Sequence, residues 1–159
     1  MTTLDTSLLF ELHLELGAID TVGRTPYGQR VIGNLGGGRF EGARLRGTVL
    51  PSGGYWGLFT PDGTLSVDGR MCLRTDDGVL IYAVYAGRWA ITPETMAQLA
   101  TSEQIAKHDP SDYYLRIHFL FETETSSGPR RYDWLNRLIA VGSGRRVADG
   151  IDYSVFEIL

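Results

Sequence analysis

Residues 67–87 read VDGRMCLRTDDGVLIYAVYAG, two alternating runs separated by an Asp-Asp-Gly turn. Asp77 and Gly78 suit the positive φ values of a two-residue type I′ turn, so the segment is predicted to be a β-hairpin. The resulting register places Arg70 opposite Tyr85, on the same face as Asp68. Because the opposite face is also largely apolar, both faces are expected to be covered. Two covered faces are typical of a barrel wall with a partly apolar lumen.

Asp68 and Arg70 lie two residues apart on this face, which leaves two alternatives. In the first, they form an ion pair inside the lumen, so that neither charge is buried alone. In the second, they form a salt bridge at the rim, of the kind that is common on protein surfaces. Both alternatives stay open at this point.

Segments with strand character recur along the whole chain and are separated by Gly, Pro and Asp turn signals. The clearest is LLFELHLEL at 8–16, in which Leu or Phe occupies every second position. About nine such segments predict an all-β fold, a barrel or a sandwich, in one domain that spans residues 1–159. The other candidate strands are 29–32, 43–50, 55–59, 64–75, 79–87, 113–124, 134–141 and 151–158.

One short helix is predicted near residue 93. Thr92 can cap it, Pro93 suits the first helical position, and Glu94 complements the helix dipole. The polar stretch 101–111 that follows is expected to be the longest irregular connection, either a lid or an ordinary loop.

Composition narrows the functional class. The net charge is −4 and the basic residues are scattered among 19 acids, so neither nucleic acid nor a membrane surface is indicated as a partner. The N-terminal stretch has acids within its apolar run and no basic region before it, which favours a cytoplasmic protein without a signal peptide or a spanning helix. Cys72 is the only cysteine, which excludes an internal disulfide and a cysteine-based metal cluster.

Other cofactor signals are also missing from the sequence. The three histidines have no metal-ligand spacing. The glycine-rich segment 36–42 lacks the Gly-Lys-Ser/Thr ending of a phosphate loop and is expected to be a turn or a bulge. Neither a metal nor another cofactor is therefore expected.

Several separated blocks together resemble a widespread family, domain of unknown function three-two-three-seven. They are GGGRFEG at 36–42, LRGTVLPSGGYW at 45–56, DGR at 68–70, LRTDDGVLIY at 73–82, DPSDYY at 109–114, FET at 121–123 and YDWLNRLIAVGSGRR at 132–146. The resemblance covers nearly the whole chain. It implies a single antiparallel barrel of calycin or allene oxide cyclase type, with about eight to ten strands and one short helix. It also implies a lumen for a small apolar molecule, chemistry without a cofactor, and frequent oligomers.

Three predicted lumen residues are assigned to catalysis. Glu122, in the FET block, is the first candidate for a general base, because enclosure raises the pKa of a carboxylate toward the operating pH. Pairing with an arginine would instead make it structural. Arg70 is predicted to hold a substrate oxygen and to stabilise a developing enolate, and Asp68 to orient Arg70 or to act as a second acid.

The remaining candidates are assigned to substrate binding. The tryptophans would stack on a flat ligand, although core packing is their commoner role. The tyrosines would supply neutral donors, the amide would polarise a carbonyl or make a buried hydrogen bond, and the histidine is an alternative base. These candidates are Trp56, Tyr85, Tyr132, Trp134, Asn136 and His118.

Three functions are compatible with these residues. The leading hypothesis is a cofactor-free isomerase, cyclase, hydratase or lyase that uses acid/base catalysis on a hydrophobic oxygenated metabolite, such as an enone, a polyketide-like or an aromatic compound. The alternative is a non-catalytic carrier that sequesters a small apolar ligand. A third is a structural oligomer whose lumen is plugged by side chains. A homo-oligomer, a dimer or larger, is expected because the outer face of the hairpin and the C-terminal strand are apolar.

Overall fold

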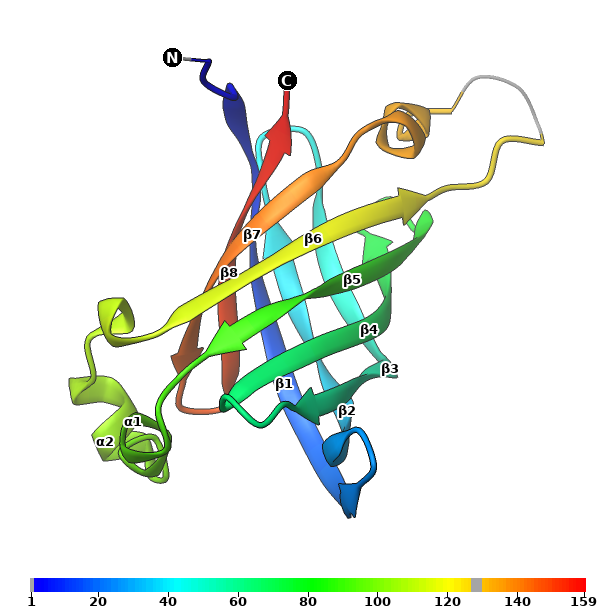
Figure 1. Ribbon diagram of the computed structural model, residues 1–159. Coiled ribbons are helices and arrows are strands. Elements are labelled where there is room, and N and C mark those ends of the chain that lie inside the picture. Colours follow the sequence, from blue (N-terminus) through cyan, green and yellow to red (C-terminus); the bar gives the residue numbers. More distant parts are fainter. Residues whose placement is uncertain (1, 127–129) are drawn as a thin grey trace.

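The computed structural model describes residues 2–126 and 130–159. Within these residues, antiparallel strands close into one barrel in chain order, with β1 hydrogen-bonded to β8 (Figure 1). The strands are β1 Thr6–Thr25, β2 Gly28–Glu41, β3 Arg46–Phe59, β4 Thr64–Thr75, β5 Leu80–Ala90, β6 Tyr114–Glu122, β7 Ala140–Val147 and β8 Gly150–Ile158. The helices are α1 Pro93–Ala97 and α2 Ser102–Lys107, with 3-10 turns η1 Pro110–Asp112 and η2 Asp133–Arg137. The predicted antiparallel barrel is confirmed.

Bulges explain most differences between the predicted and the observed strands. Residues 46–50 and 55–59 of two predicted segments belong to one strand, β3, whose register with β2 and β4 shifts near Gly53 instead of ending there, and residues 43–45 precede it. Gly53 has a φ of 115°, which glycine adopts without a steric penalty. The glycine-rich segment 36–42 overlaps a register shift between β2 and β3, as expected for a bulge.

The β4–β5 hairpin has a three-residue turn, not the predicted two-residue turn. The Thr75 amide donates to the Val79 carbonyl and the Gly78 amide donates to the Thr75 carbonyl, both at 2.9 Å. Gly78 has a φ of 89°, the left-handed position that follows a type I turn in hairpins of this length. The longer turn moves the pairing of the two strands by one residue.

This one-residue shift exchanges the faces of β5 relative to β4. Arg70 lies opposite Val84, and Tyr85 lies opposite Gly69. Tyr85 is 2% exposed and points into the lumen together with the buried face of β4. The face that carries Asp68 and Arg70 is therefore the outer wall, and the predicted pairing of Arg70 with Tyr85 was wrong.

Aromatic side chains fill the lumen in the half nearer η2. Phe10 packs against Phe40 and Phe121, with ring centroids 5.5 and 6.1 Å apart, and Phe119 stacks on Phe121 at 5.9 Å. All four rings are at most 5% exposed. Since burying one such side chain stabilises a fold by roughly 1.5–3 kcal/mol, this half is the main packed core.

The connection between β5 and β6 is more regular than predicted. The expected helix begins at Pro93, with the Thr92 hydroxyl accepting a hydrogen bond from the Thr95 amide at 3.1 Å. The stretch predicted to be irregular contains α2, whose N-terminus is a capping box of Thr101 and Gln104. Because Ile105 of α2 is buried, this segment is packed rather than free. Both helices lie at the end of the barrel away from η2 (Figure 1).

Candidate functional site

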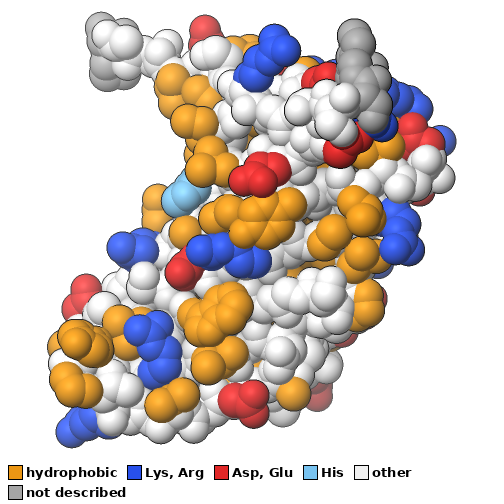
Figure 2. Space-filling view, turned by 90° about the vertical axis from the view of Figure 1, so that its right-hand side faces the viewer, with side chains coloured by type: hydrophobic (Ala, Val, Ile, Leu, Met, Phe, Trp, Pro, Cys, Tyr) orange, Lys and Arg blue, Asp and Glu red, His pale blue; other side chains and the backbone are white. Residues whose placement is uncertain are grey.

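Five of the residues predicted for the lumen lie on the outer wall. Asp68 and Arg70 form an ion pair, but their side chains are 60% and 40% exposed. Side chains on β6 alternate between buried and exposed, and His118 and Glu122 belong to the exposed set. Trp56 is 45% exposed. The surface alternative for the ion pair is therefore correct, and the lumen placement of these residues was wrong. Figure 2 shows how hydrophobic and charged side chains mix on one outer face.

Tyr132 lies in the barrel end formed by η2, not beside Tyr85. It is 4% exposed, and its hydroxyl donates to Asp77 Oδ1 at 2.8 Å. Hydrogen bonds from Thr75 and Tyr132 lower the pKa of Asp77. Tyr132 thus links η2 to the β4–β5 turn through this hydrogen bond, so its role here is structural.

Trp134 and Asn136 belong to the same barrel end. The predicted strand 134–141 begins only at Ala140, so Trp134 and Asn136 lie on η2 and share no strand face. The Arg44 guanidinium lies over the Trp134 ring, with its central carbon 3.9 Å from the ring centroid. Asn136 is exposed, and its Oδ1 accepts from the Thr123 amide at 2.7 Å. Trp134 packs against the core, but neither Trp134 nor Asn136 lines the lumen cavity, so the structure gives no support there for the predicted stacking and carbonyl-polarising roles.

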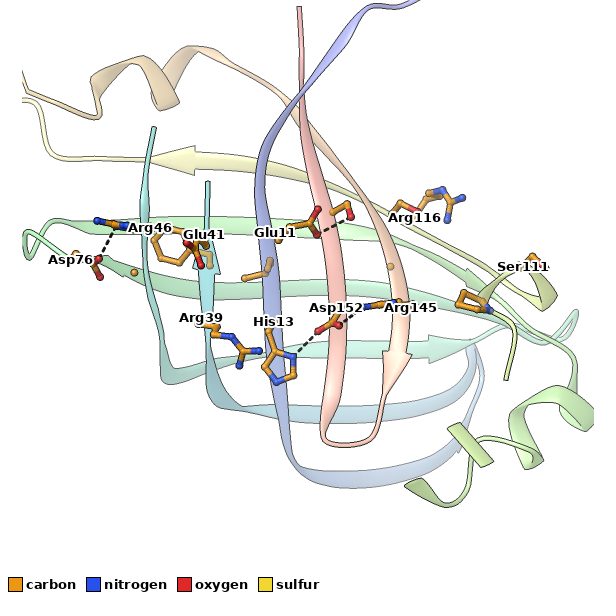
Figure 3. A pocket seen from close by; sticks show the side chains of 17 residues that line it. Glu11, His13, Arg39, Glu41, Arg46, Asp76, Ser111, Arg116, Arg145 and Asp152 are labelled. Atoms are coloured by element: carbon orange, nitrogen blue, oxygen red, sulfur yellow. Dashed lines mark hydrogen bonds and ion pairs between the residues drawn. The ribbon is translucent and has the colours of Figure 1, made fainter. Parts of the chain in front are cut away.

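A broad groove crosses the outer wall over β2, β1, β8 and β7, with a volume of about 980 Å³ (Figure 3). Asp152 links two other side chains of the groove: one carboxylate oxygen lies 2.7 Å from His13 Nδ1, and the other accepts from Arg145 at 3.0 Å. Ser154 donates to Glu11 at 2.8 Å. These polar side chains therefore form hydrogen bonds with one another on the outer wall.

The charges in this groove are interleaved. The acids and arginines that line it are Glu11, Glu41, Asp76, Asp152, Arg39, Arg46, Arg116 and Arg145. Because the signs balance and several members are paired with each other, the groove favours neither an anion nor a cation. It is open to solvent and is lined mainly by charged and polar side chains, whereas small-molecule sites are lined mostly by apolar ones.

A small cavity lies inside the barrel, in the half away from η2. Its volume is about 40 Å³. A cavity that holds one water has a volume of roughly 10–15 Å³. A ligand of more than a few atoms therefore fits only if side chains move. Leu16, Tyr55 and Ile151 are only half-buried, which places the mouth of the cavity beside them. The lining residues are Leu14, Leu16, Leu35, Tyr55, Leu65, Val67, Tyr85, Trp89, Leu115, Ile151 and Tyr153.

Three phenol hydroxyls supply most of the polar atoms of this cavity wall. Tyr85 donates to the Gly54 carbonyl at 3.3 Å. Within residues 2–126 and 130–159, no side-chain hydrogen bond is made by Tyr55 or Tyr153, so both hydroxyls keep their capacity for a ligand. Such hydroxyls can donate to a ligand oxygen or accept from a ligand hydroxyl.

Burial raises the pKa of all three phenols. Tyr55 further raises the pKa of Tyr85, and both raise the pKa of Tyr153, whereas nearby Arg146 lowers the pKa of Tyr55. The phenols are therefore neutral at physiological pH. They act as hydrogen-bond donors in an apolar setting, not as bases.

Each of these tyrosines lies opposite a glycine on the neighbouring strand. A Cβ atom at the glycines would come within 2.2, 2.1 and 2.5 Å of the respective phenol rings, well inside normal contact. The missing side chains let the rings lie against the barrel wall. The pairs are Tyr55 with Gly33, Tyr85 with Gly69, and Tyr153 with Gly144.

Trp89 adds an indole to the same wall. It is 8% exposed, and its Nε1–H is buried without a hydrogen-bond partner in the described part of the chain. Its ring meets Tyr113 edge-on at 5.7 Å, and Tyr113 stacks on His108 at 5.9 Å. An unpartnered buried donor is uncommon in folded proteins, and here it belongs to a residue that lines the apolar cavity described above.

Arg146 neighbours two residues that line the cavity, Ile151 across the β7–β8 pair and Tyr55, whose pKa it lowers. It follows Gly142 and Gly144 on the inward face of β7, directly opposite Ile151. Its main-chain N–H donates to the Tyr113 hydroxyl at 2.7 Å. Burial lowers the pKa of its guanidinium, which nevertheless stays charged because arginine titrates far above neutral pH.

The candidates predicted from the sequence include Tyr85 but not the other cavity residues Tyr55, Trp89 and Tyr153, nor Arg146, which lies opposite Ile151. A usable signal was present for two of them. Alternation in IDYSVFEI separates Tyr153 from Asp152 and Ser154, and alternation in GSGRR separates Arg146 from Arg145. Nothing comparable distinguishes Trp89, because tryptophan in a strand is most often plain core.

Comparison with known proteins gives the same fold and identifies the family. The family model "Protein of unknown function (DUF3237)" matches residues 5–158. The chain belongs to this family. A UPF0311 protein of Rhodopseudomonas palustris is 29% identical over 157 residues, 99% of this chain and 98% of the relative. Its crystal structure superposes with a TM-score of 0.88 over all of both chains.

Two further structures share the barrel of this DUF3237 protein. A "beta-barrel like protein" from Acinetobacter baumannii is 31% identical, covers 100% of this chain and 98% of its own, and has a TM-score of 0.81. A structure from Penicillium herquei covers 100% and 97%, with a TM-score of 0.70 and 20% identity, and so shows the fold alone. The family and fold predicted from the sequence blocks are thus confirmed.

Among the described residues of this DUF3237 protein, no helix is long and apolar enough to cross a membrane. Among residues 2–126 and 130–159, no group of three or more His, Cys, Asp or Glu side chains is arranged to hold a metal ion.

Proposed function

We propose that this protein binds a small hydrophobic oxygenated molecule in the half of the barrel lumen away from η2. One observation carries the proposal: Tyr55 and Tyr153, whose hydroxyls make no hydrogen bond in the described residues, and Trp89, whose indole N–H has no partner there, line the same apolar cavity. Apolar walls with a few converging polar groups are the usual composition of a small-molecule site. Since the cavity is small, binding requires the half-buried mouth residues to move aside.

The chemistry that best suits this site is cofactor-free conversion of a carbonyl or phenolic compound, as an isomerase, cyclase, hydratase or lyase. Neutral phenols in an apolar cavity stabilise negative charge that develops on a substrate oxygen, for example when a carbonyl becomes an enolate. The hydroxyls of Tyr55 and Tyr153 would donate to that oxygen, and the leucines and Val67 would hold the carbon skeleton. The Penicillium herquei protein, which is described as an enzyme, supports this direction by analogy of fold only.

A non-catalytic carrier is the second candidate, and a specific observation favours it. The described lining of the cavity contains no carboxylate and no histidine, the side chains that most often move a proton in catalysis. Glu122, the predicted base, lies on the outer wall. A carrier needs only the donors and the apolar walls.

The two candidates differ in what happens to the bound molecule. A variant carrying Trp56→Phe and Trp134→Phe leaves Trp89 as the single fluorescent reporter beside the cavity. Titration with acetophenone, 2-cyclohexenone and 2-naphthol should quench Trp89 if the lumen binds such compounds. Mass spectrometry of each mixture after incubation separates conversion from simple binding.

Matched tyrosine variants locate the binding site. Tyr55→Phe and Tyr153→Phe should each weaken binding about fivefold to tenfold, the cost of one hydrogen bond, whereas Tyr114→Phe, at a 54% exposed position, should not. Equal binding in all three variants, or no binding of any probe, would rule the proposal out. The second outcome would favour a lumen plugged by side chains.

We also propose that the protein forms a homo-oligomer through the outer wall of β5, β6, β7, β8 and β1. Outward residues pair across these strands in a largely apolar row, in which Leu8 and Leu120 are 52% and 45% exposed. The neighbours in that row are Val84 with Leu120, His118 with Val141, Val141 with Phe156, and Phe156 with Leu8. Multi-angle light scattering that gives the mass of one chain would contradict this.

A further inference from the structure

Arg146 lies on the inward face of β7, directly opposite Ile151, which lines the cavity. No carboxylate of the described residues forms an ion pair with its guanidinium within 4.0 Å. Asp149, on the neighbouring turn, acts on Arg146 only from a greater distance and lies 3.4 Å from His13 Nε2. A half-buried charge without a partner is costly, and a ligand of opposite charge would relieve that cost.

Hydrogen bonds fix the orientation of this guanidinium. Its Nη1 donates to the carbonyl oxygens of Val147 and Gly150, at the two ends of the β7–β8 turn. The edge formed by Nε and Nη2 has no partner in the described residues. That edge presents two parallel N–H groups, which is the geometry that a carboxylate accepts in bidentate fashion.

The surroundings of Arg146 connect it to the apolar cavity. Ile151, its direct partner across β7 and β8, lines the cavity, and so does Tyr55, whose titration Arg146 influences. An anion at Arg146 would therefore have its carbon skeleton against Ile151 and Tyr55, pointing into the lumen.

We propose that the ligand of this site is a hydrophobic monocarboxylate whose carboxylate is held by the Nε–Nη2 edge of Arg146 and whose apolar body enters the lumen. The inference rests on the proposed lumen binding and adds the class of ligand. The Tyr55 hydroxyl lies beside the same mouth and supplies a neutral donor to a second oxygen of the ligand. Esters and amides of the same acids lack the charge and are poor ligands.

The experiment uses matched pairs that differ only in this charge: benzoate, cinnamate and decanoate, each against its methyl ester, measured by isothermal titration calorimetry. The wild-type protein should bind at least one acid about tenfold more tightly than its ester, as expected for a charge-assisted bidentate pair. Arg146→Gln should bring that ratio to within about twofold, and Arg146→Lys should retain an intermediate ratio.

Arg145 provides the matched control. It is the adjacent arginine, but it points outward and pairs with Asp152, so Arg145→Gln should keep the full acid preference. Equal binding of acid and ester by the wild-type protein would overturn the inference and leave lumen binding standing. Acid preference that survives Arg146→Gln would also overturn it. Binding of neither member of any pair would refute this inference and, with the neutral probes above, test lumen binding separately.

Discussion

Gly69 lies directly across from Tyr85, and the phenol ring occupies the space that a Cβ atom at Gly69 would need, 2.1 Å from the ring. This relationship places Tyr85 against the inner wall of the barrel rather than across the lumen. It also explains why a residue without a side chain stands in the middle of β4, where glycine is otherwise unfavourable. The space left in front of the ring belongs to the cavity.

Gly69→Ala should destabilise the protein by about 1–3 kcal/mol, the usual cost of forcing an extra methyl group into a packed interior. The Tyr85 ring must rotate or shift, so its hydrogen bond to Gly54 should be lost as well. Urea denaturation gives the free energy of unfolding. A second substitution, Tyr85→Ala, should remove most of the penalty, because the clash then has no partner.

Gly36→Ala is the control for that substitution. A Cβ atom there would meet its nearest neighbour at 3.5 Å, an ordinary contact, so the change should be nearly neutral. Equal losses at Gly36 and Gly69, or no rescue by Tyr85→Ala, would show that the ring does not occupy the space described.

Tyr153→Phe should make the protein less sensitive to alkali. Burial raises the pKa of Tyr153, so the folded protein keeps this proton at a pH where the unfolded chain, with tyrosine pKa values near about 10, releases it. The stabilisation is complete below a pH of about 10 and is lost as the pH rises further, by about 1.4 kcal/mol per pH unit for each such group. The free energy of unfolding, measured in urea from a pH of about 9 to about 11, should therefore fall less steeply in the variant.

Tyr27→Phe serves as the reference for this pH series, because Tyr27 is 77% exposed and has no lumen contact. Its slope should match that of the wild-type protein. The same slope in Tyr153→Phe would mean that the Tyr153 phenol ionises as easily in the folded as in the unfolded chain.

Asp68→Asn, Arg70→Gln and Glu122→Gln should leave ligand binding in the lumen unchanged. All three side chains lie on the outer wall and are exposed or half-exposed to solvent. Binding of the neutral probes to the Trp89 reporter should agree with the parent protein within about twofold, the scatter expected for exposed groups. A tenfold loss of probe affinity in any of the three variants would instead indicate that the ligand binds at the outer wall.

Val67→Phe should abolish binding in the lumen. Val67 is 8% exposed and lines the cavity, and the larger ring exceeds the free space, at a cost of about 1–3 kcal/mol in stability. Val84→Phe makes the same substitution on the outward face of β5 and should preserve binding. Calorimetry on both variants checks this. Retained affinity in Val67→Phe would place the ligand elsewhere.

The strands were well predicted from the sequence because their evidence is local. Alternation and turn residues identify strands one by one, but their number alone left a barrel or a sandwich open, and the family resemblance supplied the closed barrel. Residues 134–137 were misassigned because the apolar residues that suggested a strand there, Trp134 and Leu135, are packed by tertiary contacts onto a 3-10 turn. The capping box at Thr101 and Gln104 was a readable signal for α2.

The candidate site was harder to predict from the sequence, because the β4–β5 turn has one residue more than predicted. Asp-Asp-Gly is compatible with both a two-residue and a three-residue turn, and the choice decides which face of the hairpin is inside. The predicted two-residue turn put Asp68 and Arg70 on the same face as Tyr85, and this led to their predicted placement in the lumen. The longer turn, which the structure adopts, places them in water and brings Tyr85 inside.

Strands β1, β2 and β6 each contribute one side chain to the aromatic-filled half and another to the hollow half: Phe10 and Leu14, Phe40 and Leu35, and Phe121 and Leu115. The same strands therefore carry both the packed core and the cavity wall. Substitutions around the mouth can change the shape of the cavity while the phenylalanines in the other half keep the barrel packed.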